Sequence, residues 1–187
     1  EFLKKNFGDS QYPDAVYISA NPQVQLHGID RRFYDRIRLW ESEWNDELRT
    51  VPPGAVVTRT LQAAEKFPHK RLIVHFVQPH YPFIGDQGRE ISHATLTGAG
   101  EISDEREFAT IWDKLAADEI DTKVVWDAYL ENLSLALDHV ERLENKLDGK
   151  TVITSDHGNA FGEYGVYGHP KRRFISPLIT VPWLEVN

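Results

Sequence analysis

Apolar and polar residues alternate along the chain in blocks that predict alternating strands and helices. Short apolar runs at residues 15–20, 72–77 and 151–154 predict strands. The run at 72–77 is nearly continuous, which is typical of a strand buried on both faces of a parallel sheet. A last apolar segment at 179–186 is a further strand candidate.

Apolar residues spaced three to four positions apart predict helices between these strands. We expect helices at 31–46, 56–66 and 105–117, and the most regular one at 123–147. In the first, the apolar positions are Phe33, Tyr34, Ile37, Trp40 and Trp44. In the last, a single stripe consists of Val125, Tyr129, Leu133, Leu137, Val140, Leu143 and Leu147.

Short apolar strands that alternate with helices favour the α/β class, with a three-layer sandwich around a mostly parallel central sheet. The length of 187 residues and the absence of a dividing linker predict one domain over residues 1–187. Residues 84–104 are rich in Gly, Ser, Thr and charge and predict a long loop, which in a compact domain is often functional.

The amino-acid composition argues against several classes of protein. A net charge of −8 argues against a nucleic-acid partner. This mild acidity fits an ordinary cytosol or a moderately salty one equally well, so the compartment stays unknown, with the cytoplasm favoured. The absence of cysteine excludes disulfides and thiolate chemistry within the chain. No apolar run reaches the ~18 residues that a membrane helix needs. The chain begins at Glu1 and has no methionine, so we expect a natural start, and any targeting segment, upstream.

The richest candidate chemistry lies where the 151–154 strand ends, at Asp156-His157-Gly158. Parallel sheets place ligand-binding residues just past the carboxyl ends of their strands. Asp156 offers a hard oxygen ligand and His157 a nitrogen ligand, while Gly158 permits a sharp turn. The pattern predicts half of a metal site. The structural alternative is an Asx-type turn that closes the strand.

Two further histidines follow strands in the same way. His80 comes shortly after the 72–77 strand, and His169 lies twelve residues beyond His157. Each alone is typical of a surface side chain, but together with Asp156 they can converge on one rim of a parallel sheet. His75 lies within its strand and alternates away from that rim, so we interpret it as a core histidine.

Other motifs add less. Lys171-Arg172-Arg173 is a basic cluster in an acidic protein, and it is either a solvated loop or an anion-attracting site next to His169. Gly149-Lys150-Thr151 resembles the end of a P-loop, but Glu144 stands where that motif needs glycine. The chain contains no Gly-x-Ser-x-Gly elbow.

These residues carry a family resemblance. Ser155-Asp156-His157-Gly158, then Phe161-Gly162-Glu163 and Tyr167-Gly168-His169, resembles the carboxyl-side signature of the alkaline phosphatase superfamily. The most similar branch is the sulfatase-like proteins with their relatives, the phosphoethanolamine transferases. The segment 78–83 resembles the His-x-Pro-Phe segment of that branch. The resemblance covers most of the chain and implies a mostly parallel central sheet flanked by helices.

The resemblance also implies roles. Asp156 and His157 would ligate one divalent metal ion, and His80 and His169 would contact the sulfate or phosphate group or protonate the leaving oxygen. Lys171 would add to substrate binding, a role that follows from the positive charge of the basic cluster and not from the resemblance. His157 and His169 replace the asparagine and lysine of many sulfatases, which is a phosphatase-like or transferase-like departure. The imidazole ligand favours Zn²⁺ or Mn²⁺ as the bound ion, and Ca²⁺ and Mg²⁺ are kept as alternatives.

The implied function is a metal-dependent hydrolase of small-molecule sulfate or phosphate esters. The family's nucleophile and first metal aspartate lie upstream of the matched segments, so we expect this chain by itself to be inactive. Two alternatives stay open, namely a phospho-group transferase of the same superfamily and a non-catalytic binding module. A second metal is disfavoured, because no histidine stands four residues after Asp30, Asp35, Asp86 or Asp104.

Overall fold

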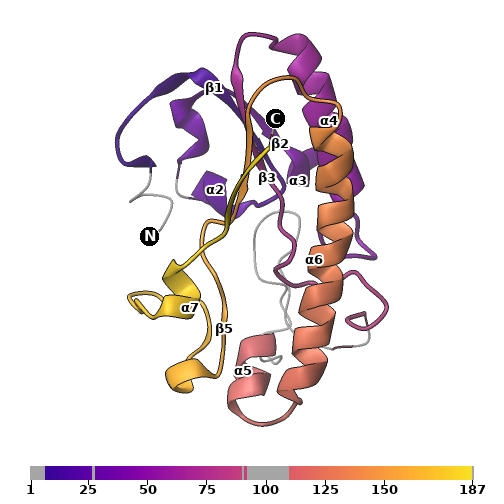
Figure 1. Cartoon of the computed structure of the whole chain (residues 1–187), viewed down its shortest axis with the longest axis vertical. Coiled ribbons are helices and arrows are strands. Elements are labelled where there is room, and N and C mark those ends of the chain that lie inside the picture. The colour runs from indigo at the N-terminus through magenta and orange to yellow at the C-terminus, as the bar shows by residue number, and fades with distance from the viewer. Residues whose placement is uncertain (1–6, 27, 90, 92–109, 187) are drawn as a thin grey trace.

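A computed structural model of the chain describes residues 7–26, 28–89, 91 and 110–186 (Figure 1). Strand β1 (Tyr12–Ser19) lies between β2 (Phe33–Arg38) and β3 (Arg71–His75), and both neighbours run parallel to it. The molecule is therefore a mixed α/β fold with a three-stranded parallel sheet. This confirms the α/β class that the sequence predicts.

Burial of β1 explains its central position. Its carboxyl half is a run of buried residues, in which Ala15, Val16 and Ile18 are 0% exposed. Val16 pairs with Asp35 on one side and with Leu72 on the other. Small and β-branched residues fit this position, because a strand covered on both faces has no solvated side.

The predicted helix at 31–46 is wrong. This segment instead forms the 3-10 turn η1 (Asp30–Arg32), then β2, and then the short helix α3 (Leu39–Ser42). Phe33 and Ile37 also fit a period of two, and Phe, Tyr and Ile favour strands. Pairing with β1 supplies backbone hydrogen bonds along one edge, and this tertiary contact decides the conformation.

Helix α4 (Pro53–Lys66) packs on β1 and β3, and the long helix α6 (Thr122–Glu144) runs alongside α4 (Figure 1). Both helices confirm the prediction. Pro53 suits the first turn of α4, where its missing N–H has no helical partner anyway. The helix ends at Lys66, and its cap residue Phe67 stands directly before a proline.

The buried face of α6 differs from the predicted stripe. Leu137 is 45% exposed, although it stands in the middle of that stripe. The buried residues of the helix are Val125, Ala128, Asn132, Ala136 and Leu143. Small side chains on this face allow close packing, and Gly54 of α4 lies so near α6 that a Cβ there would be 3.3 Å from His139 Cε1.

Helix α5 (Ile111–Ala116) starts at Thr110, which forms a capping box with Asp113. It covers the lower end of α6 (Figure 1), and its buried side chains join Phe83, Val125 and Ala128 in a second apolar cluster. The predicted helix began at residue 105. Residues 92–109 lie outside the described part of the chain, as does most of the predicted loop at 84–104.

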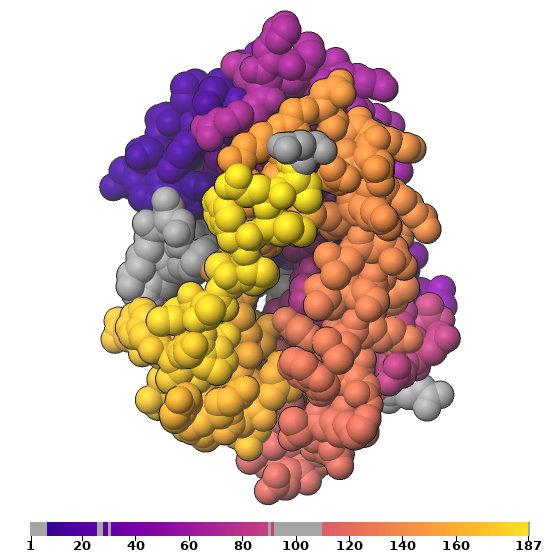
Figure 2. Space-filling model, viewed as in Figure 1, coloured from indigo at the N-terminus to yellow at the C-terminus, as the bar shows by residue number. Residues whose placement is uncertain are grey.

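Strand β4 (Thr151–Thr154) pairs antiparallel with β7 (Trp183–Val186), and the short helix α7 (Ser176–Ile179) precedes β7. The predicted strand at 179–186 is therefore confirmed only in its second half. β5 (Ala160–Phe161) and β6 (Tyr167–Gly168) form a small hairpin across the 3-10 turn η2 (Glu163–Gly165), and a short helix, α2 (Gln23–Leu26), follows β1. The surface is hollowed between the yellow C-terminal segment and α6 (Figure 2).

The sheet centre gives a direct test of this fold. Replacing fully buried Ile18 with alanine should lower the free energy of unfolding by about 2–5 kcal/mol, because it removes packed methylene groups and leaves a cavity. The matched control is Val124→Ala on α6, where the side chain is 45% exposed. It should change stability by less than about 0.5 kcal/mol. Urea unfolding measures both, and equal losses would contradict the placement of Ile18.

Candidate functional site

The three predicted histidines lie together. The ring centroids of His157 and His169 are 4.4 Å apart, and those of His80 and His169 are 5.3 Å apart. We call His80, His157 and His169 the histidine cluster. His80 follows β3, His157 follows β4 and His169 follows β6. The predicted convergence is therefore present, but the three strands belong to three different sheets and not to one parallel sheet.

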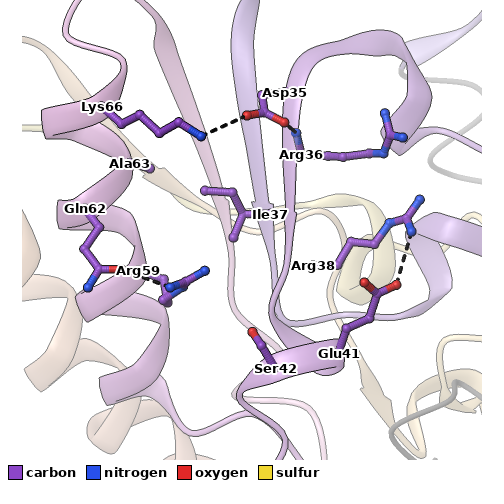
Figure 3. Close-up of a pocket in the computed structure, with 10 residues that line it drawn as sticks. All are labelled: Asp35, Arg36, Ile37, Arg38, Glu41, Ser42, Arg59, Gln62, Ala63 and Lys66. Carbon is purple, nitrogen blue, oxygen red and sulfur yellow. Dashed lines mark hydrogen bonds and ion pairs between the residues drawn. The ribbon is translucent and has the colours of Figure 1, made fainter.

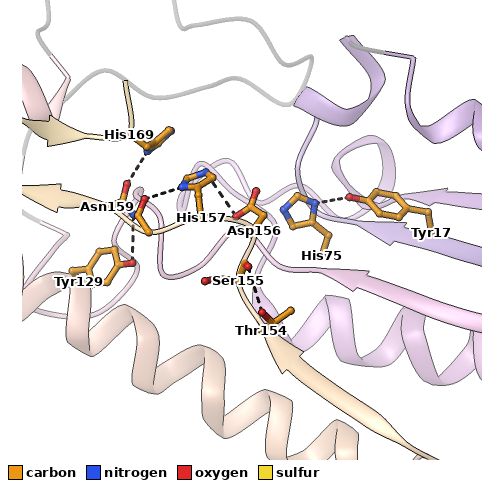
Figure 4. A network of polar contacts seen from close by, with 10 residues as sticks. Tyr17, His75, Tyr129, Thr154, Ser155, Asp156, His157, Asn159 and His169 are labelled. Carbon is orange, nitrogen blue, oxygen red and sulfur yellow. Dashed lines mark hydrogen bonds and ion pairs between the residues drawn. The ribbon is translucent and has the colours of Figure 1, made fainter. Parts of the chain in front are cut away.

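Asp156 joins this cluster through its neighbour. Its Oδ1 lies 3.7 Å from His157 Nε2 (Figure 4). His157 Nδ1 donates a hydrogen bond of 2.9 Å to the carbonyl oxygen of Gly158, which can only accept. In a neutral ring, Nε2 therefore carries a lone pair. A nitrogen lone pair and a carboxylate oxygen thus lie near each other, an arrangement that a proton or a cation stabilises.

Gly158 is required by a close backbone approach. A Cβ at this position would lie 2.0 Å from the carbonyl oxygen of Pro177. The Gly158 N–H also donates to Leu178 O at 3.1 Å. The segment around α7 therefore lies directly against the turn that presents Asp156 and His157, which no other residue type would permit without a shift.

A buried amide on α6 holds the loop that carries His80. Asn132 is 0% exposed, and its Nδ2 donates to the carbonyl oxygens of Pro79, His80 and Pro82 at 3.2, 3.0 and 3.4 Å. Its Oδ1 accepts from the N–H of Ile84 at 3.1 Å. One side chain thus satisfies backbone groups along the whole loop. His80 itself stacks on Tyr81, with centroids 4.3 Å apart, and its Nδ1 donates to the Tyr81 carbonyl oxygen.

His169 is held from the other side of the cluster. Its Nδ1 lies 2.7 Å from Asn159 Oδ1, and Asn159 Nδ2 donates to Tyr129 Oη on α6 at 3.4 Å (Figure 4). In all three rings of the cluster, Nδ1 is therefore hydrogen-bonded to an oxygen atom. Nε2 is the remaining nitrogen in each.

Electrostatics favour a neutral His169. Burial of the ring, followed by the neighbouring imidazoles of His80 and His157, lowers the pKa of His169 to about 4, while Asp156 opposes the shift. His169 is nevertheless exposed to solvent, so water weakens this effect. An anion beside the rings would reverse it, because a nearby opposite charge favours the protonated form.

His75 is a half-buried residue whose neighbourhood the sequence interpretation missed. Its Nδ1 lies 2.9 Å from Tyr17 Oη, as a satisfied core histidine requires. Burial lowers the pKa of His75, and the nearby charge of Asp156 acts in the opposite direction. Figure 4 shows the imidazole beside Asp156, at the carboxyl end of β3. The sequence interpretation placed His75 away from the site, because side chains alternate along a strand. In the structure, His75 nevertheless lies near Asp156.

Lys171 does not join the cluster. The residue is exposed, and among the described residues its ammonium group makes no hydrogen bond or ion pair. Its role in substrate binding stays a prediction.

Aromatic side chains pack beside the cluster. Tyr81 contacts Trp112, with ring centroids 6.2 Å apart, and Phe161 contacts Trp112 and Tyr129. Burial also raises the pKa of Tyr81 and of Tyr129. The two phenol groups therefore lie in surroundings less polar than water.

A cavity of about 490 Å³ lies elsewhere, between β2, α3 and α4 (Figure 3). It shares no residue with the histidine cluster. Its charged side chains pair with one another, as in Lys66–Asp35 at 3.9 Å and Arg38–Glu41 at 3.1 Å. We therefore place the candidate site at the cluster, where titratable groups converge from separate strands.

Comparison of the chain with protein-family models and with curated proteins gave no match. Within the described residues, no three His, Asp or Glu side chains are arranged to hold a metal ion. None of the helices in the described part of the chain is long and apolar enough to cross a membrane.

The amide of Asn132 offers a test of how the His80 loop is held. Asn132→Ala should lower the free energy of unfolding by about 2–4 kcal/mol, because it leaves several buried backbone groups without partners. Ser134→Ala, an exposed change on the same helix, should have little effect. Urea unfolding compares the two variants. A loss below about 0.5 kcal/mol for Asn132→Ala would show that the amide does not hold the loop.

Proposed function

We propose that this chain carries the metal- and anion-binding side of a metal-dependent hydrolase of sulfate or phosphate esters, with the three-layer fold of the alkaline phosphatase superfamily. The observation that carries the proposal is the meeting of Asp156 and His157 with two further imidazoles at the ends of separate strands. An acid and an imidazole supply metal ligands, and imidazoles beside them suit a transferred oxyanion.

The donor geometry fits a single divalent ion. Two ligands on a tetrahedral zinc ion, each about 2.1 Å from the metal, lie roughly 3.4 Å apart. Asp156 Oδ1 and His157 Nε2 are 3.7 Å apart, so a small movement brings both into a coordination sphere. The Nδ1 hydrogen bond to Gly158 orients the ring, as hydrogen bonds commonly do for metal-bound histidines. In this proposal the remaining ligands come from outside the described residues.

The other two imidazoles would bind the transferred group. A bound divalent metal supplies Lewis-acid activation of the ester and of the attacking oxygen. His80 and His169 would stabilise negative charge on the sulfate or phosphate group by hydrogen bonds from protonated Nε2 atoms. Binding of the anion would protonate His169, because the anion raises the pKa that burial and the neighbouring imidazoles depress. The ring could then donate its proton to the leaving oxygen.

The open edge of β3 supports a larger sheet. β3 pairs with β1 on one side, and among the described residues no strand pairs with its other edge. Its near-continuous apolar run is typical of a strand with neighbours and cover on both sides. In the proposed fold, a further strand lies at this edge and brings the nucleophile and another metal ligand.

A phospho-group transferase of the same superfamily is the second candidate. The imidazoles of His157 and His169 favour it, since they stand where many sulfatases have asparagine and lysine. The two candidates share the metal and the anion site and differ only in the acceptor, which is water for a hydrolase and an alcohol for a transferase.

Metal binding tests the site assignment. We expect the purified chain to bind Zn²⁺ or Mn²⁺ in calorimetric titrations, and Asp156→Asn to weaken binding at least tenfold, because it removes an anionic ligand. Asp148→Asn, an exposed change in the loop before β4, should leave the affinity unchanged. Equal affinities of the wild type and Asp156→Asn would refute the assignment.

Catalysis tests the need for a nucleophile from outside residues 1–187. With metal bound, the chain should hydrolyse p-nitrophenyl phosphate and p-nitrophenyl sulfate only at the background rate. It should still bind inorganic phosphate or sulfate, and His169→Ala should weaken this binding. Robust hydrolysis that His169→Ala abolishes would contradict the external nucleophile, and binding of neither anion would favour a non-catalytic module.

A further inference from the structure

We propose that Asn159 is a positioning residue that keeps His169 in the tautomer with its proton on Nδ1, and that the hydroxyl of Tyr129 holds Asn159 in place. The hydrogen bonds of Asn159 to His169 and Tyr129 are observed in the structure and do not depend on the proposed function. Their use in chemistry rests on the proposed function, in which His169 binds the transferred group.

The hydrogen bond between Asn159 and His169 determines which nitrogen of the imidazole carries the proton. Asn159 Oδ1 lies 2.7 Å from His169 Nδ1. An amide oxygen can only accept, so Nδ1 must carry the proton. In a neutral imidazole the lone pair then resides on Nε2. Nε2 is thus the atom that can accept a proton or a hydrogen bond from a ligand.

The β5–β6 hairpin brings these two residues together. Ala160 pairs with Gly168 and Phe161 pairs with Tyr167, so Asn159 and His169 come next in the antiparallel register. Gly168 permits this packing, because a Cβ there would lie 2.7 Å from the indole of Trp112. The spacing of ten residues between Asn159 and His169 is therefore set by the hairpin.

Helix α6 supplies the second support. Asn159 Nδ2 donates to Tyr129 Oη at 3.4 Å. The ring of Tyr129 is itself fixed by stacking on Trp126, at 6.1 Å and 11°, and by an edge contact with Phe161 at 5.4 Å. The amide is thus held between a rigid helix and the imidazole. Tyr129 thus limits the movement of the amide, whose oxygen faces His169.

The Nδ1 partner of His169 differs in kind from the Nδ1 partners of His80 and His157. The Nδ1 atoms of His80 and His157 donate to the carbonyl oxygens of Tyr81 and Gly158, the next residues in the chain. Their tautomers follow from the backbone. Of these three Nδ1 contacts, the one of His169 goes to a side chain, and that side chain stands two residues after His157, in the turn that presents the proposed metal ligands.

Nitrogen NMR of the metal-free, ¹⁵N-labelled protein tests the proposal. At pH 8, above the ordinary imidazole pKa, long-range proton–nitrogen spectra identify the protonated ring nitrogen. The variant His169→Gln assigns the His169 signals. We expect the wild type and Asn159→Asp to hold the proton on Nδ1, because a carboxylate also accepts. Asn159→Leu should move most of the population to the Nε2–H form.

Tyr129→Phe provides a second variant that keeps the ring packing. It should shift part of the His169 population towards Nε2–H, whereas the signals of His80 and His157 should stay unchanged in every variant. If Asn159→Leu does not fold, the wild-type tautomer and Tyr129→Phe decide. A wild-type proton on Nε2 overturns the proposal, and so does a His169 tautomer that stays unchanged in whichever of Asn159→Leu and Tyr129→Phe fold. Because no metal or ester is present, either result leaves the test of the metal site unaffected.

Discussion

The candidate site depends on the buried amide of Asn132. This side chain lies on α6 and hydrogen-bonds the backbone of the loop from Pro79 to Ile84. A buried polar side chain is costly unless its hydrogen bonds are made, so the helix and the loop require each other. Because the loop carries His80, the position of α6 determines where that imidazole meets His169 and the turn after β4.

The same helix also supports the opposite side of the cluster. Tyr129, one turn before Asn132, reaches Asn159 and through it His169. A helical spacing of three places both side chains on neighbouring parts of one face. Strands of three separate sheets, β3, β4 and β6, deliver the histidines to one place, and α6 then fixes two of the three. The side chains of the site are therefore held by strand ends and by one helix face. Such regular elements position side chains more precisely than loops do.

The sequence predicted β1, β3, β4, α4 and α6, because each has a strong apolar pattern bounded by proline, glycine or charge. It also predicted the convergence of His80, His157 and His169, since chains leaving the ends of strands often share an edge. The segment at 31–46 was mispredicted, because Phe33 and Ile37 fit both a helical and an alternating pattern and only the pairing with β1 decides. The polar supports Asn132 and Asn159 were missed. A signal existed for Asn132, which stands four residues from both Ala128 and Ala136 on the buried line of α6.

The central claim is that Asp156 and His157 hold a metal ion with the other two imidazoles beside it. Anomalous diffraction from crystals soaked in zinc tests it most directly. The account predicts one strong peak about 2.0–2.2 Å from an Asp156 carboxylate oxygen and from His157 Nε2. Zinc bound at other residues, with Asp156 and His157 unligated, would contradict the account.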